Sequence, residues 1–268
     1  MLIYVNGDSQ TDGIGLGDAT VFPEYPGNSL HIDWDVVNPW SSLRAHLTKS
    51  RNLVDTLKQE NRKRCWATHL EKLTGNEVIN ESVGASTMFG ILTRTIHDID
   101  SLLKQNKAPD VVLIGLTTEE RIPLINHTPT IHDDSEWVYS LLPTHVDHGD
   151  LIYQKYAKEY WKSHTDEAML IFFLYECLHI KHYVNAKLGI DPIFLNTSPH
   201  FYKNFKLINY TKIHLLREVW DLLKFNEVHE QKSFWNVAVQ DGFTACAHFA
   251  EPGHMKYAKY VAEEILKI

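Results

Sequence analysis

The sequence has little of several features that mark specialised classes of protein. Its 268 residues include only three cysteines. Because they are widely spaced and odd in number, we expect no disulfide framework and infer a reducing, cytoplasmic location. The longest apolar run, Ala168–Tyr175, is far shorter than the roughly 20 residues of a membrane span. Met1–Val5 lead straight into turn residues, so we expect no signal peptide.

Positive charge is also scarce. Lysine and arginine number 26 against 34 acidic residues, which gives a formal net charge of −8. This balance argues against nonspecific nucleic-acid binding and against a polybasic membrane anchor. The glycines of 13–17 do not form a dinucleotide-binding fingerprint, and no Walker lysine motif occurs. A nucleotide-binding α/β protein therefore lacks support.

Metal binding is a further alternative. Neutral imidazoles and carboxylates are suitable ligands for zinc and other divalent ions. The sequence has no His-Glu-x-x-His motif and no cysteine pair at ligand spacing. We therefore expect no metal and no other cofactor, and interpret these side chains as polar loop and helix surface. The clustered residues are His127, His132, Asp133, Asp134, His145, Asp147, His148, His179 and His182.

The composition that remains is that of a folded globular chain, with 44% hydrophobic and 22% charged residues. Short apolar runs alternate with helical patterns, which predicts a three-layer α/β/α sandwich with a flavodoxin-like parallel sheet of about five strands. The expected strands are Leu2–Val5, Val78–Ile79, Val111–Ile114, Ile193–Leu195 and Trp235–Val239. The expected helices include 62–73, 86–105, 150–163, 166–188, 211–225 and 252–266.

One segment interrupts the alternation. Residues 121–188 read as a helical insertion within a single domain that spans 1–268. Insertions of this size often cover a site as a lid. A helical layer that only extends the core is the other interpretation, and the sequence leaves both open.

A candidate nucleophile follows the first strand. Gly7-Asp8-Ser9 stands at its end, and sites in open parallel sheets lie at the carboxyl ends of strands. At this position the Ser9 hydroxyl could act as a nucleophile, with the oxyanion of the reaction stabilised beside it. Asp8 or Ser9 capping a helix is the structural alternative.

A candidate base and its acid lie near the other end of the chain. Glu251-Pro-Gly-His254 begins the last expected helix, and a carboxylate three residues before a histidine can orient its imidazole. Two loops complete the set. Gly84 follows the second strand and Thr117 follows the third, so four strand-end loops are expected to converge.

These blocks resemble those of the SGNH hydrolases, also called GDSL-type esterases and lipases. Gly7-Asp8-Ser9 resembles the family's first block, Gly84 its second, and Glu251-x-x-His254 its last, with Glu in place of the usual Asp. The third block departs, because Thr117 stands where the family has Asn. The resemblance implies a Ser9-His254-Glu251 triad and an oxyanion hole from Ser9, Gly84 and Thr117.

The function expected from this resemblance is acyl-ester hydrolysis or transfer through an acyl-enzyme. Numerous aromatic residues offer faces on which sugar rings stack, so a carbohydrate or other small hydroxylated ester is the expected substrate. A catalytically impaired relative used for binding is the alternative, favoured by the altered third block. The sequence does not indicate the oligomeric state.

Overall fold

The computed structural model has a four-stranded parallel sheet at its centre, in the order β2-β1-β3-β6. Its strands are β1 (Leu2–Asn6), β2 (Glu77–Asn80), β3 (Val111–Gly115) and β6 (Ile193–Leu195). The described residues are 1–47, 51–84, 86–117, 122–125, 138–141, 151–163, 165–197, 206, 208 and 213–268. Strands β4 (Ile122–Ile125) and β5 (Val138–Leu141) pair separately and antiparallel.

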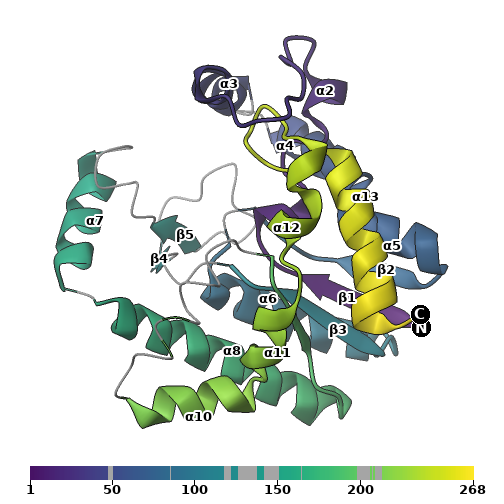
Figure 1. The fold of residues 1–268 in the computed structure, drawn as a ribbon, viewed down its shortest axis with the longest axis vertical. Helices are drawn as coiled ribbons and strands as arrows, with labels where there is room; N and C mark the ends of the chain where they lie inside the picture. The colour runs from purple at the N-terminus through teal and green to yellow at the C-terminus, as the bar shows by residue number, and fades with distance from the viewer. Residues whose placement is uncertain are drawn as a thin grey trace.

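Helices cover both faces of the central sheet (Figure 1). Helices α6 (Met88–Lys104), α8 (Asp166–Leu188) and α10 (His214–Leu222) share one hydrophobic core with the sheet. Helices α5 (Trp66–Thr74) and α13 (Glu251–Tyr260) share the core on the other face. The three-layer α/β/α architecture expected from the sequence is thereby confirmed.

The strands supply both cores because successive side chains point to opposite faces of a sheet. Tyr4 and Val112 belong to the core with α6 and α8, whereas Ile3 and Leu113 belong to the core with α5 and α13. All four are fully buried. Full burial of one aliphatic side chain stabilises the fold by roughly 1.5–3 kcal/mol, so the sheet is held from both sides.

The ends of the two long helices follow ordinary capping chemistry. Thr87 precedes α6 and its hydroxyl accepts the Gly90 N–H, and Thr165 does the same for Ala168 at the start of α8. Gly189 ends α8 in the left-handed conformation. The other elements are α1 (Ser9–Asp12), α2 (Asp18–Val21), α3 (Trp34–Leu47), α4 (Arg51–Arg62), α7 (Leu151–Ser163), α11 (Phe225–Glu230), α12 (Phe234–Ala238), the 3₁₀ turn Val239–Asp241 and the π-helical turn Val261–Leu266.

The prediction of a fifth strand at Trp235–Val239 is wrong. These residues lie in α12 and the 3₁₀ turn that follows it. Ser233 caps α12, because its hydroxyl accepts the Asn236 N–H at 3.1 Å. A short, mostly apolar segment suits a buried strand and a short buried helix equally well, and the cap decides between them here. The other four predicted strands are confirmed.

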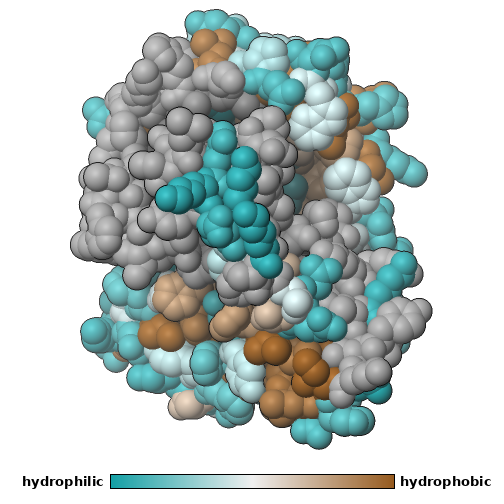
Figure 2. Space-filling model, turned by 90° about the vertical axis from the view of Figure 1, so that its left-hand side faces the viewer, coloured by the Kyte–Doolittle hydropathy of each residue, from teal (hydrophilic) through white to brown (hydrophobic). Residues whose placement is uncertain are grey.

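The last part of the expected insertion is a layer of the core. Leu170, Phe173 and Cys177 of α8 are buried in the core that this helix shares with the central sheet. Much of the segment on which the lid prediction depends, 126–137 and 142–150, lies outside the described residues, so the lid stays a prediction. Figure 2 views the molecule from the left-hand side of Figure 1 and shows patches of hydrophobic surface in the lower half of that face.

Candidate active site

Ser9 begins α1 directly after β1. Asp8 is the N-cap residue, and its Oδ1 accepts the Gln10 N–H at 3.1 Å. The Ser9 carbonyl accepts the N–H groups of Gly13 and Ile14 at 3.0 and 3.2 Å. The capping role that the sequence allowed for Asp8 is therefore present. It fixes the backbone of the candidate nucleophile, whose side chain is largely buried.

The end of β1 is pinned by a buried asparagine. The Asn6 amide nitrogen lies 3.0–3.2 Å from the Tyr4 hydroxyl, the Ile91 carbonyl and the Thr95 hydroxyl. Its carbonyl oxygen accepts the Gly7 N–H at 2.8 Å. Four hydrogen bonds on one side chain leave the strand end little freedom, so the turn that follows starts from a fixed point.

Three of the four predicted blocks meet at this edge of the sheet. A Cβ atom on Gly7 or on Gly115 would lie 2.5 Å from the Thr11 hydroxyl oxygen, so both strand ends close on one side chain. The Val83 N–H donates to the Gly7 carbonyl at 3.3 Å, which brings the loop after β2 beside them. The loops after β1, β2 and β3 are thus neighbours.

The second block lies against a buried carboxyl group. A hydrogen bond from the Gly84 backbone and the charges of Arg62 and Lys58 favour ionisation of Asp12. Burial opposes them and prevails, because it raises the pKa of Asp12 from 3.8 to about 6. A titrating acid therefore lies beside the amide predicted for the oxyanion hole.

Thr117, the third predicted contributor, is also buried. Its side chain is 2% exposed. Within the described part of the chain, its hydroxyl has no hydrogen-bond partner. An unpartnered hydroxyl after β3 agrees with the expected role.

Glu251 is paired with groups other than His254. Its carboxylate oxygens lie 3.4 Å from Nε2 of His69 and 3.8 Å from Nη1 of Arg64. The Nδ1 atom of His254 instead accepts the Trp66 backbone N–H at 3.1 Å. The orienting contact expected between Glu251 and His254 is thus replaced by a contact with α5.

The surroundings of His254 do not suit a general base. The ring is fully buried and packs edge-on against Phe234. Burial lowers the pKa of His254 to about 3, with smaller contributions from His69 and His248. A neutral imidazole that accepts at Nδ1 carries its proton on Nε2. Neither nitrogen is then ready to take a proton from Ser9.

A second histidine, six residues earlier, has the opposite arrangement. His248 is partly exposed, and its Nδ1 lies 2.8 Å from the Cys246 carbonyl oxygen. A carbonyl oxygen only accepts, so Nδ1 of His248 must donate. In the neutral ring Nε2 is then a proton acceptor. This is the tautomer that a general base requires.

His248 lies in a hairpin that we call the histidine hairpin, residues 243–249. Phe243 pairs with Phe249 at its base and with Ser29 on its other side. The Thr244 N–H donates to the His248 carbonyl at 2.7 Å and closes the turn. Spacing to an acid does not identify this histidine, because Ala245 and not a carboxylate stands three residues before it. The two phenylalanines that flank the short turn are the signal that the sequence offers.

The histidine hairpin packs on the turn that follows Ser9. A Cβ atom on Gly15 would lie 2.6 Å from the Thr244 hydroxyl oxygen and 3.4 Å from the Cys246 Cβ. Gly15 has a φ of +89°, a conformation that disfavours other residues. The turn after the candidate nucleophile and the turn that carries His248 are therefore in contact.

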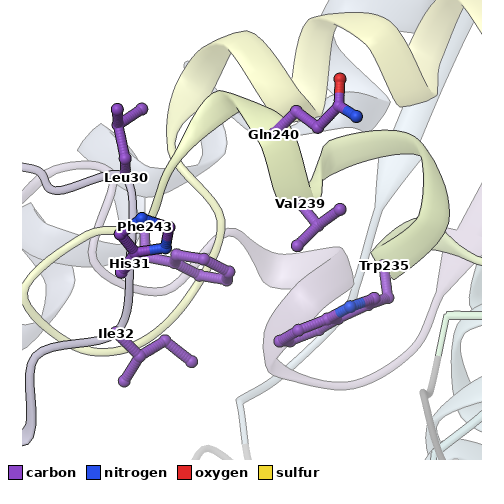
Figure 3. Close-up of a pocket in the computed structure, with 7 residues that line it drawn as sticks. All are labelled: Leu30, His31, Ile32, Trp235, Val239, Gln240 and Phe243. Carbon is purple, nitrogen blue, oxygen red and sulfur yellow. The ribbon is translucent and has the colours of Figure 1, made fainter.

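A cavity of about 500 Å³ lies beside the base of the hairpin (Figure 3). Phe243 belongs to both features. The Trp235 ring lies on the side of the cavity opposite Ile32. Gln240 and His31 are the polar residues of the lining. The complete lining is Leu30, His31, Ile32, Trp235, Val239, Gln240 and Phe243.

Among the residues that the structure describes, no group of three or more potential ligands could hold a metal ion. His179 and His182 are exposed on α8. The clusters at 127–134 and 145–148 lie outside the described residues, so for them the expectation of no metal stays a prediction. None of the described helices combines the length and apolar character needed to cross a membrane.

Comparisons with known proteins give the fold. No family model matches the chain, and no curated protein matches it. Among solved structures, the chain is similar to a carbohydrate esterase described as having divergent catalytic and non-catalytic binding functions in its active site. The TM-score is 0.50 at 12% identity, over 100% of this chain and 68% of that one. An acetyl xylan esterase, Est2A from the rumen bacterium Butyrivibrio proteoclasticus, matches with a TM-score of 0.49 and 12% identity, over 100% of this chain and 65% of that one. At these identities the likeness shows the fold alone.

Proposed function

We propose that the chain is a serine ester hydrolase of the SGNH type. The observation that carries the proposal is the meeting of three strand-end blocks, those of Ser9, Gly84 and Thr117, at one edge of the sheet. A histidine with an acceptor nitrogen lies in a hairpin that packs, at Gly15, on the turn that follows the helix of Ser9. A nucleophile, oxyanion donors and a base are the elements that acyl transfer needs, and these contacts support their assembly around Ser9.

In the proposed reaction the Ser9 Oγ attacks the ester carbonyl carbon, and its proton passes to the base. The backbone N–H of Ser9 and the Thr117 hydroxyl stabilise the oxyanion, and the Gly84 N–H joins them when it is released from Asp12. Collapse of the intermediate breaks the bond to the alcohol oxygen, which leaves with the proton from the base. Water, activated by the same base, then hydrolyses the acyl-enzyme and releases the acid.

The base is the part of the mechanism in which geometry and sequence reasoning differ. The sequence assigns it to His254, oriented by Glu251. The contact of Nδ1 with the Trp66 N–H and complete burial favour a structural role for His254. We therefore propose His248 as the base, with the Cys246 carbonyl in the position that the triad acid usually has.

The proposed substrate is a short acyl ester on a carbohydrate. The fold shared with a carbohydrate esterase agrees with this class. The cavity beside the histidine hairpin offers an indole ring and apolar walls with the polar groups of Gln240 and His31. Sugar rings stack on such aromatic faces while their hydroxyls bind polar groups at the rim.

The decisive experiment combines activity with covalent labelling. We expect the wild-type protein to hydrolyse short acyl esters and to react with a fluorophosphonate probe at Ser9. Ser9→Ala is expected to abolish labelling and to lower kcat by at least about 10³-fold, because the nucleophile is gone. Ser82→Ala, which removes another buried hydroxyl next to the same blocks, is the matched control and should keep both properties.

The alternative function is that of a binding protein with an impaired site. The replacement of the family's usual Asn by Thr117 favours it. A folded wild-type protein that neither labels at Ser9 nor hydrolyses any ester of a broad panel would establish this alternative and end the esterase proposal.

A further inference from the structure

The turn of the histidine hairpin is joined to a buried carboxylate on a distant part of the chain. Asp18, at the start of α2, is fully buried. The Cys246 thiol donates to Asp18 at 3.1 Å, although the two residues lie 228 positions apart. Cys246 is also the residue whose carbonyl accepts from His248. One residue therefore connects the carboxylate to the imidazole.

Asp18 is itself held in place by two further donors. The Trp40 Nε1–H donates to its carboxylate at 3.1 Å, and Nε of Arg44 lies 3.0 Å away. Trp40 is buried and packs edge-on against Phe22. Such donors offset the cost of burying a carboxylate, and the same hydrogen bonds hold its side chain in one orientation.

Contacts with the N-terminal segment add to the backbone hydrogen bonds within the turn around Cys246. Ala247 has a positive φ of 58°, which is unfavourable for a residue with a Cβ. The Ala245 N–H donates to the Tyr25 hydroxyl at 3.2 Å, so the neighbouring residue is anchored to the same N-terminal segment. Contacts from outside the hairpin therefore keep the turn in its strained conformation.

We infer that Asp18 is a positioning residue that acts through Cys246. By accepting the thiol hydrogen, it fixes the Cys246 peptide so that its carbonyl faces Nδ1 of His248. That contact selects the tautomer whose Nε2 accepts a proton. We call these contacts the Asp18–Cys246–His248 relay. Through it Asp18 orients the imidazole, as a triad carboxylate does, although Asp18 acts through Cys246 and not on the ring directly. The role of the relay in catalysis rests on the proposed function.

The test compares Cys246→Ala with Cys246→Ser. Alanine removes the donor to Asp18, whereas serine keeps an O–H that can donate to it. Cys177→Ala, which changes a buried cysteine of α8 on the other face of the sheet, is the matched control. Asp18→Asn keeps an acceptor oxygen without the charge, and it tests the relay should Cys246→Ala fail to fold.

Two readouts separate the relay from the esterase proposal. The first is the ¹⁵N NMR tautomer state of His248, recorded under conditions in which the ring is neutral. We expect only the Nδ1–H tautomer in the wild type, and a mixture with the Nε2–H form in Cys246→Ala. The serine variant should restore the wild-type spectrum, Asp18→Asn should give a smaller change, and the control should give none.

The second readout is kcat on a short acyl ester. We expect a fall of about 10-fold in Cys246→Ala with KM unchanged, and recovery in Cys246→Ser, because the base is misaligned rather than lost. A folded Cys246→Ala or Asp18→Asn protein with wild-type tautomer and kcat would overturn the relay. A tautomer change in a protein whose wild type lacks esterase activity would keep the relay and reject the proposed function.

Discussion

The two histidines near the end of the chain, His248 and His254, are six residues apart and have opposite chemistry. His248 lies in a partly exposed turn and donates from Nδ1 to a carbonyl. His254 lies in the closed interface between α13 and α5 and accepts at Nδ1 from a backbone N–H. The difference teaches that the group facing Nδ1, rather than the presence of a nearby acid in sequence, decides which histidine can serve as a base.

The largest expected effect is on turnover when each histidine is replaced by asparagine. His248→Asn loses the nitrogen that we propose takes the proton from Ser9, so kcat should fall by about 10³-fold or more. His254→Asn keeps an acceptor close to the position of Nδ1 for the Trp66 N–H, and kcat should stay within a few-fold of the wild type. Steady-state kinetics on one short acyl ester measures both variants.

The reverse outcome would break the comparison. His254→Asn could instead lose activity while His248→Asn retains it, with circular dichroism showing that both proteins are folded. The prediction from the sequence that His254 is the base would then be confirmed. The tautomer seen in the structure would then have to change during the reaction.

A smaller effect is expected on stability in acid. The pKa of His254 is about 3 when folded and 6.5 in its ordinary range. The unfolded chain therefore takes up a proton that the folded chain refuses, and stability is lost as the pH falls below 6.5. At pH 4 the loss from this residue is about 3 kcal/mol. Urea unfolding at pH 7 and pH 4 should show this loss in the wild type and not in His254→Asn.

Replacement of an exposed histidine provides the control for this measurement. His97 is 84% exposed, and His97→Asn should keep the wild-type dependence on pH. An acid sensitivity that is equal in the wild type and His254→Asn would mean that His254 is not closed off from solvent.

The last effect concerns the buried carboxyl group of Asp12, whose contribution to stability has the opposite dependence on pH. Its pKa is raised to about 6 by burial, so stability is lost as the pH rises from 3.8 through 6. Above pH 7 this costs about 3 kcal/mol at most. Asp12→Asn should therefore unfold at a higher urea concentration than the wild type at pH 8, and at a similar one at pH 4. Asp55→Asn, an exposed change on α4, should have no such effect.

Much of the fold was predictable from the sequence because burial on both faces leaves a clear signal in the strands. The run Val111–Ile114 is apolar at every position, as a strand between two helical layers must be. Trp235–Val239 is also mostly apolar, with Asn236 as its one polar residue, but it forms a helix that the Ser233 side chain caps. Composition alone does not separate these two cases.

The nucleophile side of the candidate site was easier to predict than the base side. Ser9, Gly84 and Thr117 follow strands, and the order of a parallel sheet brings strand ends together. The orientation of a histidine depends on backbone groups and on residues distant in sequence, such as Asp18 and Cys246. Neither kind of contact produces a characteristic spacing of residues in the sequence.

Gly15 gives this arrangement a practical meaning for protein engineering. Its positive φ and its close approach to Thr244 leave no room for any side chain. A substitution there would push apart the two turns on which catalysis is proposed to depend, while every candidate catalytic side chain stayed intact. Random libraries should therefore return inactive, folded variants at a position that no inspection of reacting groups would have flagged.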